Sequence, residues 1–119
     1  MAFDWTSGAL AEGLRCYGSG QFFEAHEHWE GVWLGCAEPE KTFLQSLIQV
    51  SAAFHHLQRG NGRGAASLLT RALGRLEKFP DEYMGVAVGA LRKSLREWLG
   101  VLETGTWTER PAYPEICRG

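Results

Sequence analysis

The sequence predicts an all-α fold of about five helices packed around a central buried helix at residues 39–59. Apolar residues recur at helical spacing along most of the chain, and the alternation typical of strands is absent. Clusters of glycine and proline divide the chain into segments of helical length. Residues 42–58 contain no formally charged side chain, so a helix there has no face typical of solvent exposure.

The first two helices follow from their breaks and their apolar spacing. Ser7 is a candidate N-cap for a helix whose residues Leu10, Leu14 and Tyr17 follow i, i+4, i+7 spacing. Gly18-Ser19-Gly20 ends that helix, because glycine favours helix termination. A second helix is expected from about residue 21 to residue 34, where Gly35 closes it.

The third helix is the predicted centre of the fold. Pro39 suits its first turn, and Glu38 and Glu40 are well placed for its dipole. It continues to Arg59 and is stopped by the break Gly60-Asn61-Gly62.

Two further helices and a tail complete the prediction. A fourth helix spans about residues 63–78 and ends at Phe79-Pro80, because proline disfavours a helical residue before it. Residues 81–86 are expected to form a loop or a short turn, and a fifth helix follows at about 87–103. One helical domain therefore spans residues 1–103. The irregular tail of residues 104–119 packs on it or extends from it, with these candidate anchors: Trp107, Tyr113 and Ile116.

Two of the helices carry polar side chains in apolar surroundings. On a helical wheel of about 100° per residue, His26 and Glu30 lie side by side with large apolar groups on both flanks. The third helix carries Gln45, Gln49 and His56 on one uncharged stripe. An unpartnered buried polar group costs about 1–3 kcal/mol, so we expect these two sets to pair. The predicted buried polar cluster is lined by Trp29 and Trp33.

These motifs also resemble a known family. The resemblance rests on these segments: Phe23-Glu24-Ala25-His26-Glu27 with Trp29-Glu30 and Trp33, Phe43-Leu44-Gln45 with Leu47-Ile48-Gln49, Ala52-Ala53 with His56, Gly60-Asn61 with Gly64-Ala65, and Leu68-Leu69 with Ala72-Leu73. The chain resembles, over roughly residues 17–100, the small bacterial and archaeal family catalogued as domain of unknown function 309. The resemblance implies an all-helical fold of about five helices and no established activity.

The cluster supports two kinds of function. The first is a structural or binding module with a candidate pocket for a small ligand or protein, formed by His26, Glu27, Glu30, Trp33, Gln45, Gln49 and His56. The alternative is a metal-dependent, hydrolase-like enzyme at the same cluster. Its candidate ligands for a divalent metal are His26, Glu30 and His56, with Glu27 and His55 nearby. The chain lacks the HExxH motif and the paired Glu-x-x-His elements of well-known metal sites.

A third hypothesis is an interaction module that forms homo-oligomers or binds a protein partner. Its candidate exposed anchors are Trp5, Trp107 and Tyr113. Nucleic acid is not an expected partner, because the net charge is −2 and the bases of the second half are interspersed with acids.

Composition bounds the setting of the chain. The three cysteines are far apart and form no CxxC pair, so a reduced, cytoplasmic setting is expected. The N-terminus lacks the features of a signal peptide. The uncharged stretch is too short and too polar to span a membrane.

Overall fold

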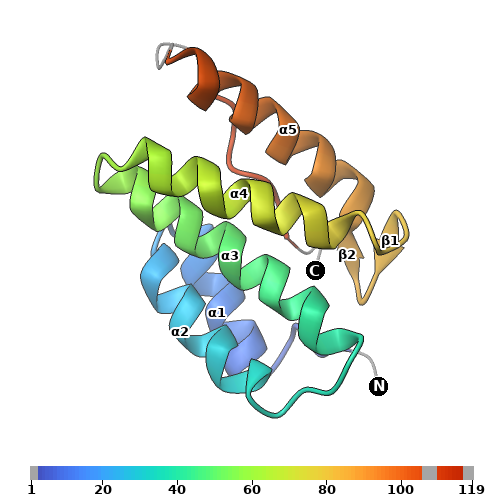
Figure 1. Ribbon diagram of the computed structural model, residues 1–119. Helices are drawn as coiled ribbons and strands as arrows, with labels where there is room; N and C mark the ends of the chain where they lie inside the picture. Colours follow the sequence, from blue (N-terminus) through green and yellow to red (C-terminus); the bar gives the residue numbers. More distant parts are fainter. Residues whose placement is uncertain (1–2, 106–109, 117–119) are drawn as a thin grey trace.

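Five α-helices form the body of the protein (Figure 1). The computed structural model describes residues 3–105 and 110–116. The elements in chain order are α1 (Gly8–Gly18), α2 (Phe22–Trp33), α3 (Glu40–Gln58), α4 (Gly62–Leu76), β1 (Glu82–Tyr83), β2 (Val86–Ala87) and α5 (Val88–Thr104). The prediction of an all-α fold is confirmed, and each helix lies within about two residues of its expected position.

Helix α3 is the centre of the fold, as its uncharged sequence predicts. It packs most extensively against α4 and also against α2, whereas α1 packs on α2 and α5 on α4 (Figure 1). Its side chains Phe43, Leu47, Val50 and Phe54 are fully buried. Two buried serines also lie on α3, and the hydroxyl of Ser51 donates to the carbonyl oxygen of Phe22 at 2.7 Å. That bond ties α3 to the start of α2.

The helix starts differ in detail from the sequence prediction. Ser7 does occupy the N-cap position of α1, but it makes no capping bond, and its hydroxyl donates to the carboxylate of Asp4 instead. Asn61, expected only as part of a break, caps α4 by accepting from the backbone N–H of Gly64 at 2.9 Å. An asparagine at this position satisfies one of the unpaired N–H groups of a helix start.

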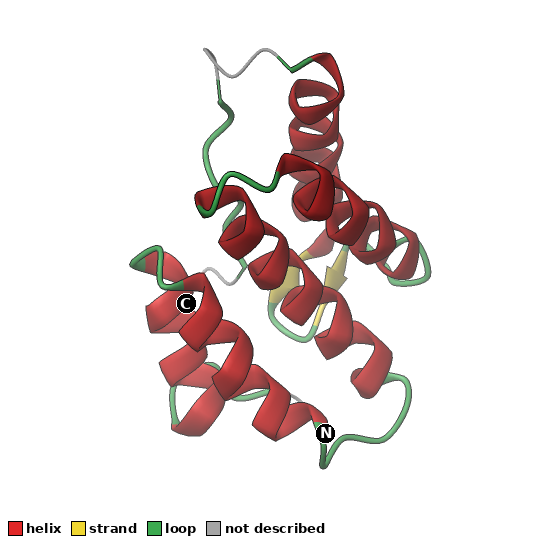
Figure 2. Cartoon of the chain, turned by 60° about the vertical axis from the view of Figure 1, so that its left-hand side comes forward, coloured by secondary structure: helices red, strands yellow, loops and turns green. Residues whose placement is uncertain are grey.

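Residues expected to form a loop or short turn contain an antiparallel hairpin, with Glu82 opposite Ala87 and Tyr83 opposite Val86. Figure 2 shows its two short strands among the helices. Met84 and Gly85 both have positive φ angles, 52° and 79°, as a type I′ turn requires. Sequence patterning misses strands of two residues because they are too short to show alternation.

Trp5 connects the N-terminal segment to this hairpin. Its indole N–H donates to the carbonyl oxygen of Met84 at 2.8 Å, and its side chain is buried. Trp5 is therefore part of the core and not the exposed anchor that the interaction-module hypothesis considered. Trp107 lies outside the described residues.

The described part of the C-terminal tail packs against the helices without forming one. The Tyr17 hydroxyl donates to the carbonyl oxygen of Pro114 at 2.7 Å, and the Trp98 indole donates to that of Ala112 at 3.1 Å. The ring of Tyr113 stacks on Trp98 with an interplanar angle of 9°. Tyr113 and the buried Ile116 thus act as the anchors expected from the sequence. Since its ring is packed in this way, Tyr113 has only part of its surface available to a partner.

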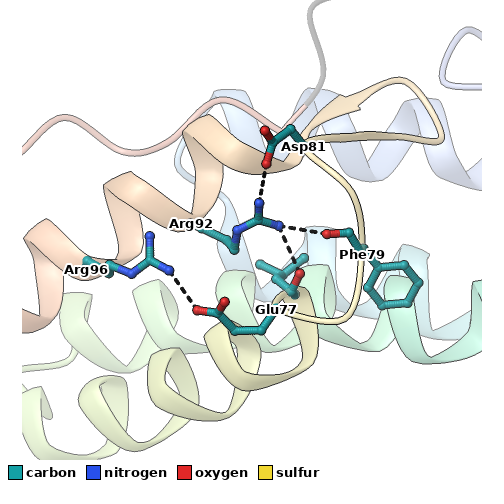
Figure 3. A network of polar contacts seen from close by, with 6 residues as sticks. Glu77, Phe79, Asp81, Arg92 and Arg96 are labelled. Carbon is teal, nitrogen blue, oxygen red and sulfur yellow. Dashed lines mark hydrogen bonds and ion pairs between the residues drawn. The ribbon is translucent and has the colours of Figure 1, made fainter.

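Polar contacts lock the end of α4 to the start of α5 (Figure 3). The guanidinium of Arg92 donates to the carbonyl oxygens of Leu76 and Phe79, each at 3.0 Å, and also binds the carboxylate of Asp81. Arg96 forms an ion pair with Glu77. The expected solvated basic face is therefore partly structural, because the side chain of Arg92 is only 13% exposed. Within the described residues, no helix is both long and apolar enough to cross a membrane.

Candidate functional site

The His26–Glu30 pair forms on α2, but at the surface. His26 Nε2 lies 2.8 Å from Glu30 Oε2, and the two side chains are 27% and 53% exposed. The prediction of a buried pair is therefore wrong for its surroundings. Helix α2 packs inward through Phe22, Ala25 and Trp29, so Phe23, which the helical wheel placed in a second apolar wall, is largely open to solvent.

The polar stripe of α3 does not join this pair. Gln49 Oε1 accepts from Arg75 Nε at 3.2 Å, and His56 Nδ1 lies 3.2 Å from the side-chain amide of Asn61. Both contacts lead to α4 or to the turn before it, away from α2. Gln45 is half-buried and makes no hydrogen bond among the described residues. The single buried network expected from the sequence is thus two separate groups on two sides of α3.

The expected metal site is not assembled. Among the described residues, no three side chains of His, Cys, Asp or Glu converge closely enough to hold a metal ion. His26 and Glu30 engage each other, whereas His56 faces Asn61. The prediction that His26, Glu30 and His56 form one ligand set is therefore wrong, because a helical wheel gives directions around each helix and not the distance between helices.

His55, a peripheral candidate in the sequence, completes a ring cluster with Phe23 and His26. The Phe23 ring lies 5.1 Å from the ring of His55 and 5.7 Å from that of His26, measured between centroids. The cluster therefore bridges α2 and α3. Burial lowers the pKa of His55 below its usual range, and the nearby cation of Arg59 lowers it further.

Two buried polar atoms of α2 lack hydrogen-bond partners among the described residues: His26 Nδ1 and Trp33 Nε1. Natural proteins satisfy most such atoms, so an orphan calls for an explanation. The Trp33 ring has a defined contact nonetheless, because Lys41 Nζ lies 4.5 Å from its centroid.

A hollow of about 200 Å³ opens on the outward side of α2. Its lining residues are His26, Glu27, Glu30, Gly31 and Leu34. Four of them stand at i, i+3, i+4 and i+7, which is the set of positions that receives one side chain of a facing helix in a coiled coil. Gly31 leaves the hollow open, because a Cβ atom placed there would meet nothing within 4 Å.

The hollow belongs to a longer stripe that we call the α2 outer face, made of Phe23, Glu27, Glu30, Gly31 and Leu34. Phe23, Glu27, Glu30 and Leu34 are spaced four, three and four residues apart, the spacing of a helix that contacts another helix. The apolar ends of the stripe are 43% exposed at Phe23 and 71% exposed at Leu34. On the helical wheel Phe23 and Leu34 form one of the two apolar flanks of His26 and Glu30, and the structure shows that this flank is exposed.

Comparison with known proteins agrees with the motifs. Residues 10–68 match the family model described as "Domain of unknown function (DUF309)". An "Uncharacterized protein" of Aquifex aeolicus (strain VF5) is 34% identical over 97 residues, which cover 81% of this chain and 29% of that relative. The chain thus spans less than a third of the relative's length. The resemblance expected from the sequence is confirmed, since residues 10–68 match the DUF309 family model.

Proposed function

We propose that this protein is a helix-docking module and that the α2 outer face binds one α-helix of a protein partner. The proposal rests on the hollow between Glu27, Glu30, Gly31 and Leu34. This hollow has the residue spacing of a site that receives one side chain of a facing helix. Large apolar side chains, Phe23 and Leu34, lie at the two ends of the same stripe and are exposed.

The stripe also defines the chemistry of the partner. Glu27 and Glu30 occupy its middle, so a partner helix needs cations there. Glu27 has no ion-pair partner among the described residues, and Glu30 is engaged only by His26. The ends of the stripe are large, so the partner needs small residues opposite them to let the helices approach. From Phe23 to Leu34 the contact spans about 16 Å, or three turns.

A small ligand suits this surface less well. The hollow is about 200 Å³ and shallow, whereas sites for drug-sized molecules enclose about 300–1,000 Å³. The Aquifex relative supports a modular role, because the similar region is only 29% of its length. A domain that accompanies other sequence is well suited to hold parts of an assembly together.

A designed peptide tests the proposal. A helical peptide would carry Ala, Lys, Lys and Ala on one stripe at the same spacing, and a second peptide would carry Glu in place of Lys. In an NMR titration of the isotopically labelled protein, the lysine peptide should shift the backbone amides of α2 between Phe23 and Trp33. Leu34→Ser should weaken binding by about tenfold, since losing a large apolar contact costs more than about 1 kcal/mol.

The matched control is Glu97→Gln, which removes an exposed carboxylate from α5 and should leave peptide binding unchanged. Glu27→Gln removes a carboxylate from the α2 outer face and should weaken binding. The proposal fails if neither peptide shifts α2, if both peptides bind equally, or if the shifts centre on α4 and α5.

A further inference from the structure

We infer that the helix that binds the α2 outer face is α5 of a second copy of this chain. This inference rests on the proposed function and names its partner. It follows from a second unpartnered helix face whose spacing, side-chain size and charge complement those of α2. Both faces come from one sequence, so the protein can assemble with itself.

The second face lies on the outward side of α5. Helix α5 buries Val88, Leu91, Leu95 and Trp98 against the rest of the protein. Its opposite side carries Gly89, Lys93, Arg96 and Gly100, which we call the α5 outer face. These residues are spaced four, three and four apart, as on α2. Small residues therefore occupy the ends of this face and cations occupy its middle.

The α5 outer face is exposed at Lys93, Arg96 and Gly100. Lys93 is exposed and has no hydrogen bond or ion pair within the described part of the chain. Arg96 is bound to Glu77, yet its side chain is still 53% exposed. A Cβ atom at Gly100 would meet nothing within 4 Å. At Gly89 the side chain of Asp81 lies 3.1 Å from the position of a Cβ atom, so this end of the face is partly covered.

An antiparallel arrangement brings the two faces into register. Phe23 then lies opposite the open Gly100, and Leu34 lies opposite Gly89, where it also meets the side chain of Asp81. In the middle, Glu27 lies opposite Arg96 and Glu30 lies opposite Lys93. Opposite charges across a helix pair set its orientation, and small residues allow the close approach that buries the apolar ends.

The symmetry of this contact is heterologous. Figure 1 shows α2 beside α1 and α3, whereas α5 lies on the other side of the molecule beside α4. Each copy therefore offers one acidic and one basic face, and copies join head to tail. An isologous pairing of α2 with α2 is disfavoured, because it would place glutamates of one copy against glutamates of the other.

Two substitutions separate the faces. Gly100→Leu blocks the seat of Phe23 on α5. It adds no clash within the monomer and replaces a poor helix former, so the variant should fold at least as well. Leu34→Ser removes the apolar end of the α2 outer face. Gly74→Leu is the matched control, since Gly74 is equally open but lies on α4.

Sedimentation equilibrium of the full chain tests the inference at protein concentrations up to about 1 mM. A contact with a binding free energy of about 4 kcal/mol has a Kd of about 1 mM, so association is detectable in this range. The wild type and Gly74→Leu should increase in mass with concentration, and Gly100→Leu and Leu34→Ser should each stay monomeric. A mixture of these two monomeric variants should form a 1:1 dimer and nothing larger, because only one intact pair of faces remains. Added salt should weaken every association.

Charge exchange gives an independent readout. Lys93→Glu should prevent association by placing like charges together, and Glu30→Lys in the same chain should restore it. Failure of that restoration would overturn the inference, as would association that survives Gly100→Leu or a mixture that does not form the dimer.

The peptide titration keeps the two proposals distinguishable when it is repeated on Gly100→Leu, whose α2 outer face stays free. If the wild type is monomeric throughout and the lysine peptide still binds α2, the inference about α5 is overturned and the docking function stands. If neither association occurs, both are overturned.

Discussion

Two polar assemblies of this protein use similar chemistry for different ends. At the junction of α4 and α5, Arg92 binds two carbonyl oxygens and a carboxylate, and its side chain is 13% exposed. On α2, His26 binds only Glu30, its other ring nitrogen is an orphan, and Glu30 is 53% exposed. The Arg92 contacts satisfy carbonyl groups at the end of α4. The His26–Glu30 pair satisfies no backbone group among the described residues.

The contrast offers a criterion for finding function in a protein of this size. Polar side chains that hold the fold are occupied by backbone groups, because a helix end leaves carbonyl oxygens that need donors. Polar side chains that bind only each other, beside exposed apolar groups, are available for a partner. On this criterion the proposed binding face lies on α2, and Arg92 belongs to the scaffold.

Replacing Arg92 should have the largest effect on stability. Arg92→Met should lower the free energy of unfolding by about 3 kcal/mol, because carbonyl oxygens of Leu76 and Phe79 lose a charged donor. Urea denaturation measures this change. Arg92→Lys should recover less than half of the loss, since an ammonium cannot reproduce the planar fork of a guanidinium. The control Arg71→Met, at an exposed position, should cost less than about 0.5 kcal/mol.

Two helix glycines extend the comparison to packing. Gly13 of α1 lies against Trp29, and a Cβ atom at Gly13 would overlap the indole ring. Gly13→Ala should therefore lower stability by about 2 kcal/mol despite a better helix former. Gly31→Ala on the α2 outer face should raise stability by about 1 kcal/mol, because its Cβ meets open space. Thermal unfolding measures both; equal effects would contradict the assignment of Gly31 to a free surface.

His26→Ala should change stability by no more than about 1 kcal/mol, because a half-exposed ion pair contributes little. A loss above about 2 kcal/mol in chemical denaturation would mean that the pair is structural. That result would remove the contrast between the two polar assemblies.

The pH dependence of His55 is expected to be the smallest effect. Burial, Arg59, His56 and His26 lower its pKa from the usual value of 6.5, and Glu24 opposes them. The folded state therefore binds this proton less readily than the unfolded state does. Its contribution to stability is present above pH 6.5 and is lost as the pH falls from there through the folded-state pKa. His55→Phe should remove this loss from a series of urea titrations between neutral and acidic pH.

The sequence predicts the fold better than the site, and the reason is physical. Helical periodicity and glycine or proline breaks are local signals, and they predicted the central position of α3. The wheel of α2 gave the right directions for His26 and Glu30, but it could not tell which apolar neighbours meet another helix. Phe23 and Leu34 therefore count as an apolar flank of a buried pair on the wheel, although they are exposed.

The polar contacts of the scaffold escaped prediction for a related reason. Arg92 appeared as one base in a charged helix, and its partners lie 11 to 16 residues away in the preceding segment. The Asn61 cap depends on how the chain enters α4. Such bonds depend on tertiary geometry that composition and spacing do not contain.

The described part of the C-terminal tail has a consequence for synthesis on the ribosome. Tyr113 fits among Phe22, Phe54 and Trp98, and Tyr17 near the other end of the chain binds the carbonyl oxygen of Pro114. The aromatic seat is built from residues translated much earlier, so it stays uncovered until the ribosome has made residues 112–116. A nascent chain therefore covers this seat last, and its aromatic surface is accessible to chaperones until then.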